Sequence, residues 1–229
     1  MRVGGNDHRI EYNEIYNAVT ESDDQGGVDM FGNPTYRGNV FRHNYFHHIG
    51  NWRGTGEQPK CGQAGIRLDD AICGTRIYGN VFERCSAGEL GFGGVQIHGG
   101  KDNVVENNLF IECSAMVSCS PWDEKRWRDY VGKALDSREI DQTLCRQRYP
   151  ELAELAEHAN RNRILRNLGW RCGELLRRAP QNLDAKDNAM LDDKEFTWKP
   201  RSFRLNRPGF DRIPFEEIGL YQDAPFRTR

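Results

Sequence analysis

A chain of 229 residues with 37% hydrophobic residues and 24 glycines is too polar for a conventional β-sandwich core, and it suits short strands joined by many turns. A formal net charge of −2 gives no reason to expect nucleic acid as a partner, and no apolar run approaches the roughly 18 residues of a membrane span. Residues 1–7 also lack the apolar segment of a signal peptide, so the cellular location stays open; a longer natural form with a leader would be secreted or periplasmic.

One pattern recurs along the chain: an apolar residue, two residues, Asn, one residue, an apolar residue, two residues, and a small or apolar residue. The steps between its asparagines are 31, 36, 28, 59 and 21 residues, as expected for coils of about 20–25 residues with loops of variable length. Stacked coils would place the asparagine amides in a hydrogen-bonded ladder, whereas independent turn asparagines would not share apolar flanks. The predicted ladder is Asn13, Asn44, Asn80, Asn108, Asn167 and Asn188.

A second strand type begins with glycine, at Gly27, Gly65 and Gly94. Alternation along these strands predicts one inward and one outward set of side chains. The inward residues are Val28, Met30, Ile66, Leu68, Val95 and Ile97. The outward residues form one column of Asp29, Arg67 and Gln96 and a second of Phe31, Asp69 and His98. A fourth, degenerate copy near residues 116–120 has no register that the sequence fixes.

The 59-residue step contains a helical insertion, predicted over residues 120–158. Ser120 before Pro121 is a candidate helix cap, and Trp127, Tyr130, Val131 and Leu135 follow at helical spacing. Ser137 is a candidate cap of a second helix carrying Ile140 and Leu144, and a third starts at Tyr149 and Pro150. Apolar helical spacing favours a packing appendage or lid over a binding module.

The fold class is therefore all-β, a right-handed parallel β-helix with coils over residues 1–119 and 159–193 and a C-terminal capping tail over 194–229. The apolar residues of the tail are expected to lie across the last coil and along the flank. At the other end, coil residues begin by Ile10 without a cover. We therefore expect either that the chain is the C-terminal part of a longer protein or that a partner seals this face, and we expect self-association through it.

The seven cysteines are an odd number without C-x-x-C spacing, which gives no indication of a zinc site. Cys85, Cys113 and Cys172 share one repeat position and should stack inside the solenoid as small buried hydrophobic residues. Because neighbouring coils are about 4.8 Å apart, a Cys85–Cys113 disulfide is left open.

Three stretches and the chain's end, residues 65–70, 78–82, 96–108 and 208–221, resemble right-handed β-helix proteins of the pectate-lyase-like superfamily. The likeness extends over most of residues 8–118 and 147–221. It implies a carbohydrate or polysaccharide partner bound along an outward strand face, by glycoside hydrolases or polysaccharide lyases. The sequence departs from the usual pattern after Gly27, where residues 28–33 read Val-Asp-Met-Phe-Gly-Asn.

The outward columns bring together the candidate catalytic residues Asp29, Asp69, Asp70 and His98. Glycoside hydrolysis needs two carboxylates in different surroundings, and Arg67 beside Asp29 should keep that carboxylate ionised, while His98 orients Asp69 or serves as the acid. The candidate substrate-binding residues are Asp24, Arg67, Gln96 and Trp52. Ordinary turn chemistry is the alternative explanation for the aspartates.

Two other functions remain open at this point. A polysaccharide lyase would need calcium and a base, for which Arg67 and Lys101 are the candidates; otherwise we expect no metal or other cofactor. The other candidate function is that of a non-catalytic glycan-binding or structural protein.

Overall fold

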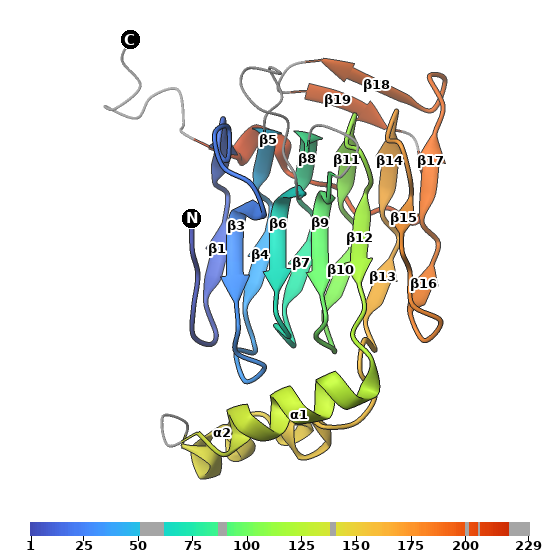
Figure 1. The fold of residues 1–229 in the computed structure, drawn as a ribbon. Coiled ribbons are helices and arrows are strands. Elements are labelled where there is room, and N and C mark those ends of the chain that lie inside the picture. The colour runs from blue at the N-terminus through green and yellow to red at the C-terminus, as the bar shows by residue number, and fades with distance from the viewer. Residues whose placement is uncertain (51–61, 87–90, 138–140, 200–201, 206, 220–229) are drawn as a thin grey trace, which may run out of the picture.

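The computed structural model describes the chain except residues 51–61, 87–90, 138–140, 200–201, 206 and 220–229 (Figure 1). Its strands occur in a repeating order of three, and equivalent strands of successive coils pair in parallel. Sheet A stacks β3 (Gln25–Phe31), β6 (Gln63–Asp69), β9 (Gly93–His98), β12 (Val117–Ser120) and β15 (Leu176–Arg177). The chain is thus a right-handed parallel β-helix, as predicted.

Two further sheets close the triangular solenoid, and both lie behind sheet A in Figure 1. Sheet B contains β1 (Arg9–Glu11), β4 (Val40–Arg42), β7 (Arg76–Tyr78), β10 (Val104–Glu106), β13 (Arg163–Leu165) and β16 (Asp184–Lys186). Sheet C contains β2 (Glu14–Tyr16), β5 (Tyr45–Ile49), β8 (Val81–Cys85), β11 (Leu109–Ile111), β14 (Leu168–Trp170) and β17 (Ala189–Leu191).

The asparagine ladder runs along the bend between sheets B and C and is confirmed in all six coils. Each asparagine before Asn188 donates from its backbone N–H and from its side-chain amide to the side-chain oxygen of the next one, at 2.9–3.0 Å. The amides also donate to main-chain carbonyls of the preceding coil, for example from Asn108 to Ile77 at 3.0 Å. These bonds satisfy polar groups that the bend would otherwise bury without partners.

The interior is apolar, and the inward residues predicted for sheet A are all buried. The rings of Phe46, Phe82 and Phe110 stack along the axis with centroids 5.0 and 4.9 Å apart. The recurrent glycine of sheet A makes room for them, since a Cβ on Gly65 would lie 2.7 Å from the Phe82 ring. The repeating glycine and phenylalanine are therefore one packing unit.

The cysteines of the shared repeat position line the interior as free thiols, so the disulfide left open above is not present. Cys85 and Cys113 are fully or almost fully buried, and Cys172 is half-buried in the fifth coil. Burial raises the pKa of the Cys113 thiol well above its usual value. These residues therefore act as small apolar groups.

A second polar column, which the sequence pattern did not predict, follows the bend between sheets A and B. Asn39, Asn103 and Asn162 occupy it, and the backbone N–H of Asn103 donates to the side-chain oxygen of Asn162 at 2.9 Å. Thr75 holds the equivalent place in one coil, between Asn39 and Asn103, and its buried hydroxyl has no hydrogen-bond partner. The column is thus interrupted at one coil.

The insertion is helical, but its helices begin later than the sequence indicated. Helix α1 spans Glu124–Leu135 and is capped by Asp123, whose side chain accepts the N–H of Arg126, whereas Ser120 ends strand β12. Helix α2 spans Gln142–Arg148 with Asp141 as its cap. In both helices the cap is an aspartate, whose carboxylate accepts the N–H three residues later, and not the predicted serine.

The rest of the insertion is a short 3₁₀ helix, Pro150–Glu154, in place of a third α-helix. Trp127 and Val131 are buried as expected, while Leu144 is 61% exposed and Ile140 lies outside the described residues. In Figure 1 the helices cross one edge of the solenoid beneath the sheet A strands. No helix in the described part of the chain is long and apolar enough to cross a membrane.

The tail follows the flank of the solenoid. An antiparallel hairpin, β18 (Phe196–Lys199) and β19 (Ser202–Leu205), precedes a second 3₁₀ helix, Phe215–Glu217. Its buried residues pack on the outer side of sheet C, and Gly219 donates to the Tyr12 carbonyl of the first coil at 2.9 Å. Of the apolar tail residues, Leu220 is outside the described residues.

The two ends of the solenoid are covered differently from the prediction, which left the first coil without a cover and placed the tail across the last coil. The first residues pair with β3, since Val3 N–H donates to the Asp29 carbonyl at 3.0 Å and Asp29 N–H to the Met1 carbonyl at 2.9 Å. One edge of the first coil is therefore covered. At the C-terminal end of the solenoid, Leu175, Leu176 and Leu183 in the last two coils remain half-buried.

Candidate functional site

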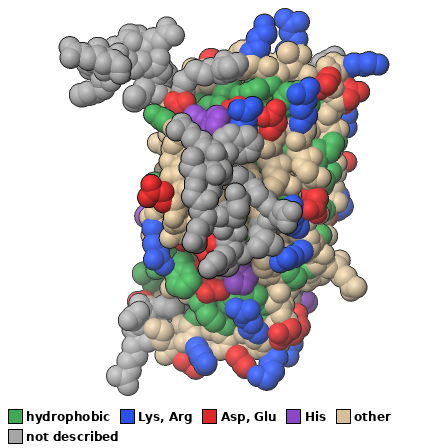
Figure 2. All heavy atoms as spheres, turned by 45° about the horizontal axis from the view of Figure 1, so that its top comes forward, with side chains coloured by type: hydrophobic (Ala, Val, Ile, Leu, Met, Phe, Trp, Pro, Cys, Tyr) green, Lys and Arg blue, Asp and Glu red, His purple; other side chains and the backbone are tan. Residues whose placement is uncertain are grey.

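The outer face of sheet A carries the candidate residues, in the two columns that the sequence predicts. The strand register pairs Asp29 with Arg67 and Arg67 with Gln96, and it pairs Phe31 with Asp69. Figure 2 shows acidic and basic side chains interspersed over the described part of this view of the molecule. The parallel register is what brings residues about 30 positions apart into contact.

Asp69 is the centre of the cluster and is 6% exposed. Its Oδ1 lies 2.7 Å from Nδ1 of His98 and 3.0 Å from a terminal nitrogen of Arg67. A carboxylate only accepts, so His98 carries its proton on Nδ1 and donates to Asp69. The predicted neighbours Asp69 and His98 are thus in direct contact.

Arg67 is buried, and its donors are used within the protein. Its Nε donates to the side-chain oxygen of Gln96 at 2.9 Å, and NH1 donates to the Asp24 carbonyl. Its remaining nitrogen pairs with the carboxylates of Asp24 at 2.8 Å and Asp69 at 3.0 Å. Arg67 therefore positions acidic groups and has little capacity left for a ligand.

Asp29 has different surroundings from those expected. Its Oδ1 is buried and has no hydrogen-bond partner, and it forms no ion pair with Arg67 within the described structure. Burial raises the pKa of Asp29, and this effect exceeds the attraction of Arg67, while the charge of Asp69 raises the pKa further. Arg67 lowers the pKa of Asp29 by less than burial raises it, and the ion pairs of Arg67 are with Asp24 and Asp69 instead.

Asp70 follows β6 with a left-handed backbone (φ +40°) and lies beside the same histidine. Its Oδ1 is 3.3 Å from Nδ1 of His98 and 3.8 Å from a terminal nitrogen of Arg126. Burial and the charge of Asp69 raise the pKa of Asp70, against the opposing charges of His98 and Arg126. The cluster thus holds three carboxyl groups in three distinct environments.

The insertion contributes a wall of the cluster that the sequence pattern did not predict. The Trp122 ring meets His98 edge-on with centroids 5.6 Å apart, and Tyr130 packs against Trp122 at 5.1 Å. Gly99 permits this approach, since a Cβ there would lie 2.9 Å from the indole. Helical spacing signals the buried face of α1, but it does not reveal which edge of the solenoid α1 covers.

The predicted substrate-binding residues differ in their position and exposure. Arg67 and Gln96 lie behind the carboxylates, with Gln96 2% exposed and its amide 3.4 Å from the Ser120 hydroxyl. Asp24 is half exposed and holds Arg67. Trp52 is outside the described residues.

Asp69, Asp70 and His98 are also the one group of described residues whose ligand atoms converge as a metal site requires, within 4.8 Å of one another. A nitrogen and two oxygens suit a transition metal, whereas calcium prefers six or more oxygens. A metal would have to displace the proton of His98 Nδ1 and lie near the Arg67 guanidinium, 3.0 Å from the same Asp69 oxygen. The contacts present therefore favour hydrogen bonding over metal ligation.

Comparison with known proteins gives one match. Residues 1–123 match the family model described as the right-handed beta helix region. Neither the curated proteins nor the solved structures contain a match to this chain. The matched segment includes the strands that carry Asp29, Asp69, Asp70 and His98, and it ends in the first residues of the insertion.

Proposed function

The chain belongs to the right-handed β-helix family, and from this premise we propose that it is a carbohydrate-active protein of the pectate-lyase-like superfamily that hydrolyses a glycosidic bond of a complex polysaccharide. The observation that carries the proposal is the contrast between Asp29 and Asp69 on adjacent coils. One oxygen of Asp29 is buried without a partner, while Asp69 faces a guanidinium and an imidazole. Contrasting environments separate a pair of carboxyl groups into a proton donor and a base.

In this proposal Asp29 is the acid, because its raised pKa favours the protonated form. Asp29 gives its proton to the glycosidic oxygen as the bond from that oxygen to the anomeric carbon breaks. Asp69, oriented by His98 and Arg67, acts at the anomeric carbon, either as nucleophile or as the base that takes a proton from the attacking water. Water supplies the hydroxyl of one product and the proton that restores the acid.

Asp70 is the second candidate for the partner of Asp29. Its raised pKa matches a proton donor better than a base, so the assignment of the base to Asp69 is preferred. An Asp70→Asn variant separates the two choices, because it removes the ionisable group and leaves the Asp69–His98 contact in place.

The elimination chemistry of a lyase has less support. The nitrogens of Arg67 are occupied by Asp24, Asp69 and Gln96. Lys101 is fully buried, and its Nζ donates to the carbonyls of Glu154 and Glu157 at 2.7 Å. Both candidate bases are therefore engaged in the fold.

The test is turnover of plant and algal polysaccharides by the wild type and by the Asp29→Asn and Asp69→Asn variants, followed as new reducing ends. Loss of a positioned acid or base typically lowers the rate by about 10²–10⁴. Glu174→Gln, an exposed acid at the end of sheet A paired with Arg177, is the matched control and should keep full activity. Full turnover in both asparagine variants would refute the assignment.

The same assay distinguishes the other functions. Unsaturated products whose release requires calcium would identify a lyase, and binding of a polysaccharide without turnover would identify a non-catalytic protein.

A further inference from the structure

The insertion brings a second arginine to the carboxylate cluster. Arg126 lies in the first turn of α1, and its guanidinium carbon is 3.8 Å from the centre of the Trp122 ring. A terminal nitrogen of the same group is 3.8 Å from Oδ1 of Asp70, which is too far for a hydrogen bond. Stacking on the indole therefore fixes the plane of the guanidinium without using its donors.

The two arginines of the cluster differ in exposure and in how many N–H donors are free to bind a ligand. The side chain of Arg67 is 6% exposed and its nitrogens are occupied, whereas that of Arg126 is 52% exposed. Within the described residues the Arg126 guanidinium makes only the long ion pair with Asp70 and the stack on Trp122. Five N–H groups in a planar fork thus remain for a ligand.

Trp122, the platform under Arg126, is held in place from the solenoid side. It exchanges two hydrogen bonds with Asn160, from its backbone N–H at 3.0 Å and to its carbonyl at 2.8 Å. The indole is 4% exposed and packs against His98. The guanidinium is therefore presented at a fixed distance from the histidine of the cluster.

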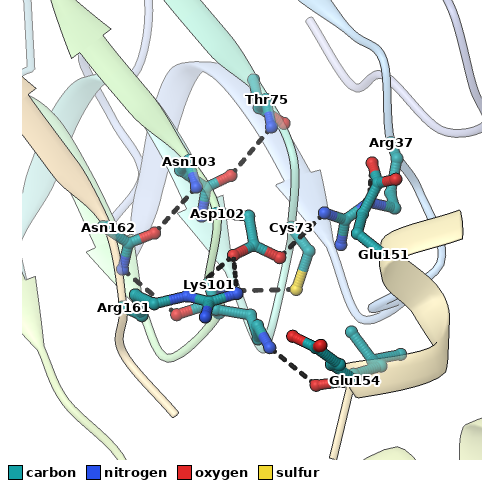
Figure 3. A network of polar contacts seen from close by, with 12 residues as sticks. Arg37, Cys73, Thr75, Lys101, Asp102, Asn103, Glu151, Glu154, Arg161 and Asn162 are labelled. Carbon is teal, nitrogen blue, oxygen red and sulfur yellow. Dashed lines mark hydrogen bonds and ion pairs between the residues drawn. The ribbon is translucent and has the colours of Figure 1, made fainter. Parts of the chain in front are cut away.

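Helix α1 is fastened both to the solenoid and to the chain that returns from the helices. The Tyr130 hydroxyl donates to the Gly32 carbonyl at 2.8 Å, and Trp127 donates to the Leu155 carbonyl at 3.0 Å. Figure 3 shows the attachment of the returning chain: Lys101 reaches the Glu154 carbonyl, and Arg37 pairs with Asp102 at 2.8 Å and Glu151 at 3.3 Å. A guanidinium on such a support loses little freedom when it binds an anion.

We propose that Arg126 binds an acidic substituent, a carboxylate or a sulfate, on the sugar unit that lies against Asp69 and Asp70. The inference rests on the proposed glycan site and adds its substrate class, an acidic polysaccharide. A planar fork binds a carboxylate or sulfate through two parallel charge-assisted hydrogen bonds, and a neutral sugar makes no use of its charge. The Asp69 carboxylate already pairs with Arg67 and accepts a hydrogen bond from His98. Burial raises the pKa of Asp70, the carboxyl group beside Arg126, which weakens its repulsion of an anion there.

The test is affinity electrophoresis of the full chain in gels that contain polygalacturonate or its methyl ester, and dextran sulfate or dextran. The first pair tests the carboxylate and the second tests the sulfate on an otherwise neutral backbone. Arg126→Gln should weaken retardation by at least one acidic polymer about 10- to 100-fold, as expected for loss of charged hydrogen bonds. Arg126→Lys should restore part of it, since lysine keeps the charge without the fork.

Arg128→Gln is the matched control, because Arg128 is on the same helix, 66% exposed, and faces Glu124. It should leave retardation unchanged. The proposal is overturned if the wild type is retarded by neither acidic polymer, or if Arg126→Gln is retarded as strongly as the wild type. Asp29→Asn should bind like the wild type but turn nothing over, so a failure of the hydrolysis proposal leaves the Arg126 result interpretable.

Discussion

Asn108 gives two hydrogen bonds to a single oxygen of Asn167, from its backbone N–H at 3.0 Å and from its side-chain amide at 2.9 Å. Its own side-chain oxygen accepts the equivalent pair from Asn80, so one residue joins three coils. Asn108→Leu should lower the free energy of unfolding by about 1–3 kcal/mol, because buried donors of the neighbouring coil lose their acceptor. Chemical denaturation measures the loss.

The control for this experiment is Asn13→Leu at the start of the ladder. Asn13 is exposed and only donates along the ladder, to Asn44. Its replacement should cost clearly less than that of Asn108. Equal costs would mean that position within the ladder does not matter.

Thr75 interrupts the second polar column, and this suggests a stabilising substitution. In the neighbouring coil, the Asn103 side-chain amide donates to the Ile72 carbonyl at 2.8 Å, whereas the Thr75 hydroxyl has no partner. Thr75→Asn should add about 1 kcal/mol and raise the melting temperature by about 2–4 °C. A melting temperature at or below that of the wild type would show that the column does not tolerate the larger side chain there.

The register of the coils could be predicted because it is set by short-range spacing. Asparagine, glycine and apolar residues recur at fixed offsets, so the neighbours of Asp29 and Asp69 follow from the alignment of Gly27 with Gly65. The second polar column, at the bend between sheets A and B, could not be predicted because one of its members is a threonine. An amide pattern broken once in four coils is not distinguishable from turn asparagines in a single sequence.

The electrostatics and the insertion could not be predicted in the same way. Arg67 has Asp24, Asp29 and Asp69 within its neighbourhood, and which of them it pairs with depends on side-chain geometry. The position of Trp122 beside His98 depends on the path of a segment of about 40 residues outside the repeat, for which no spacing rule exists. The direction of the Asp29 pKa shift was therefore not predicted, and Arg126 was overlooked.

Lys101 should be required for docking of the insertion. Its buried ammonium donates to two carbonyls of the chain that returns from the helices, and burial lowers its pKa. Lys101→Met keeps the apolar stem and removes both hydrogen bonds, so the segment should open more often and be cut faster by trypsin within residues 124–157. Lys125→Met, an exposed lysine of α1, is the control and should not accelerate cleavage beyond the loss of its own site.

In a labelling experiment, the reactivity of the described thiols should depend on how deeply each is buried. Cys73, Cys85, Cys113 and Cys119 are buried, and burial raises the pKa of Cys73 and of Cys119 to about 12. Reaction with iodoacetamide at pH 8 should modify half-buried Cys145 in the folded protein and the buried thiols only after unfolding. Fast modification of Cys113 in the native protein, located by peptide mass spectrometry, would contradict the inward column.

Asp29 should cost stability at neutral pH, and the sign of its pH dependence follows from its burial. Its pKa is raised in the folded protein, so the folded state holds this proton to higher pH than the unfolded chain does. The stabilising contribution is fully present below the unfolded pKa of about 3.9 and is lost as the pH rises through the raised folded pKa. Asp29→Asn removes the buried charge, so at pH 7 the variant should melt above the wild type, with a difference in melting temperature that narrows toward pH 4.

Asp193 is the control with the opposite pKa shift, because Arg171 and Trp170 lower its pKa. Asp193→Asn should therefore be slightly destabilising at pH 7. Melting curves of the three proteins between pH 4 and pH 8 make the comparison, and an Asp29→Asn variant that melts below the wild type at pH 7 would show that the Asp29 carboxylate is stabilised where it lies.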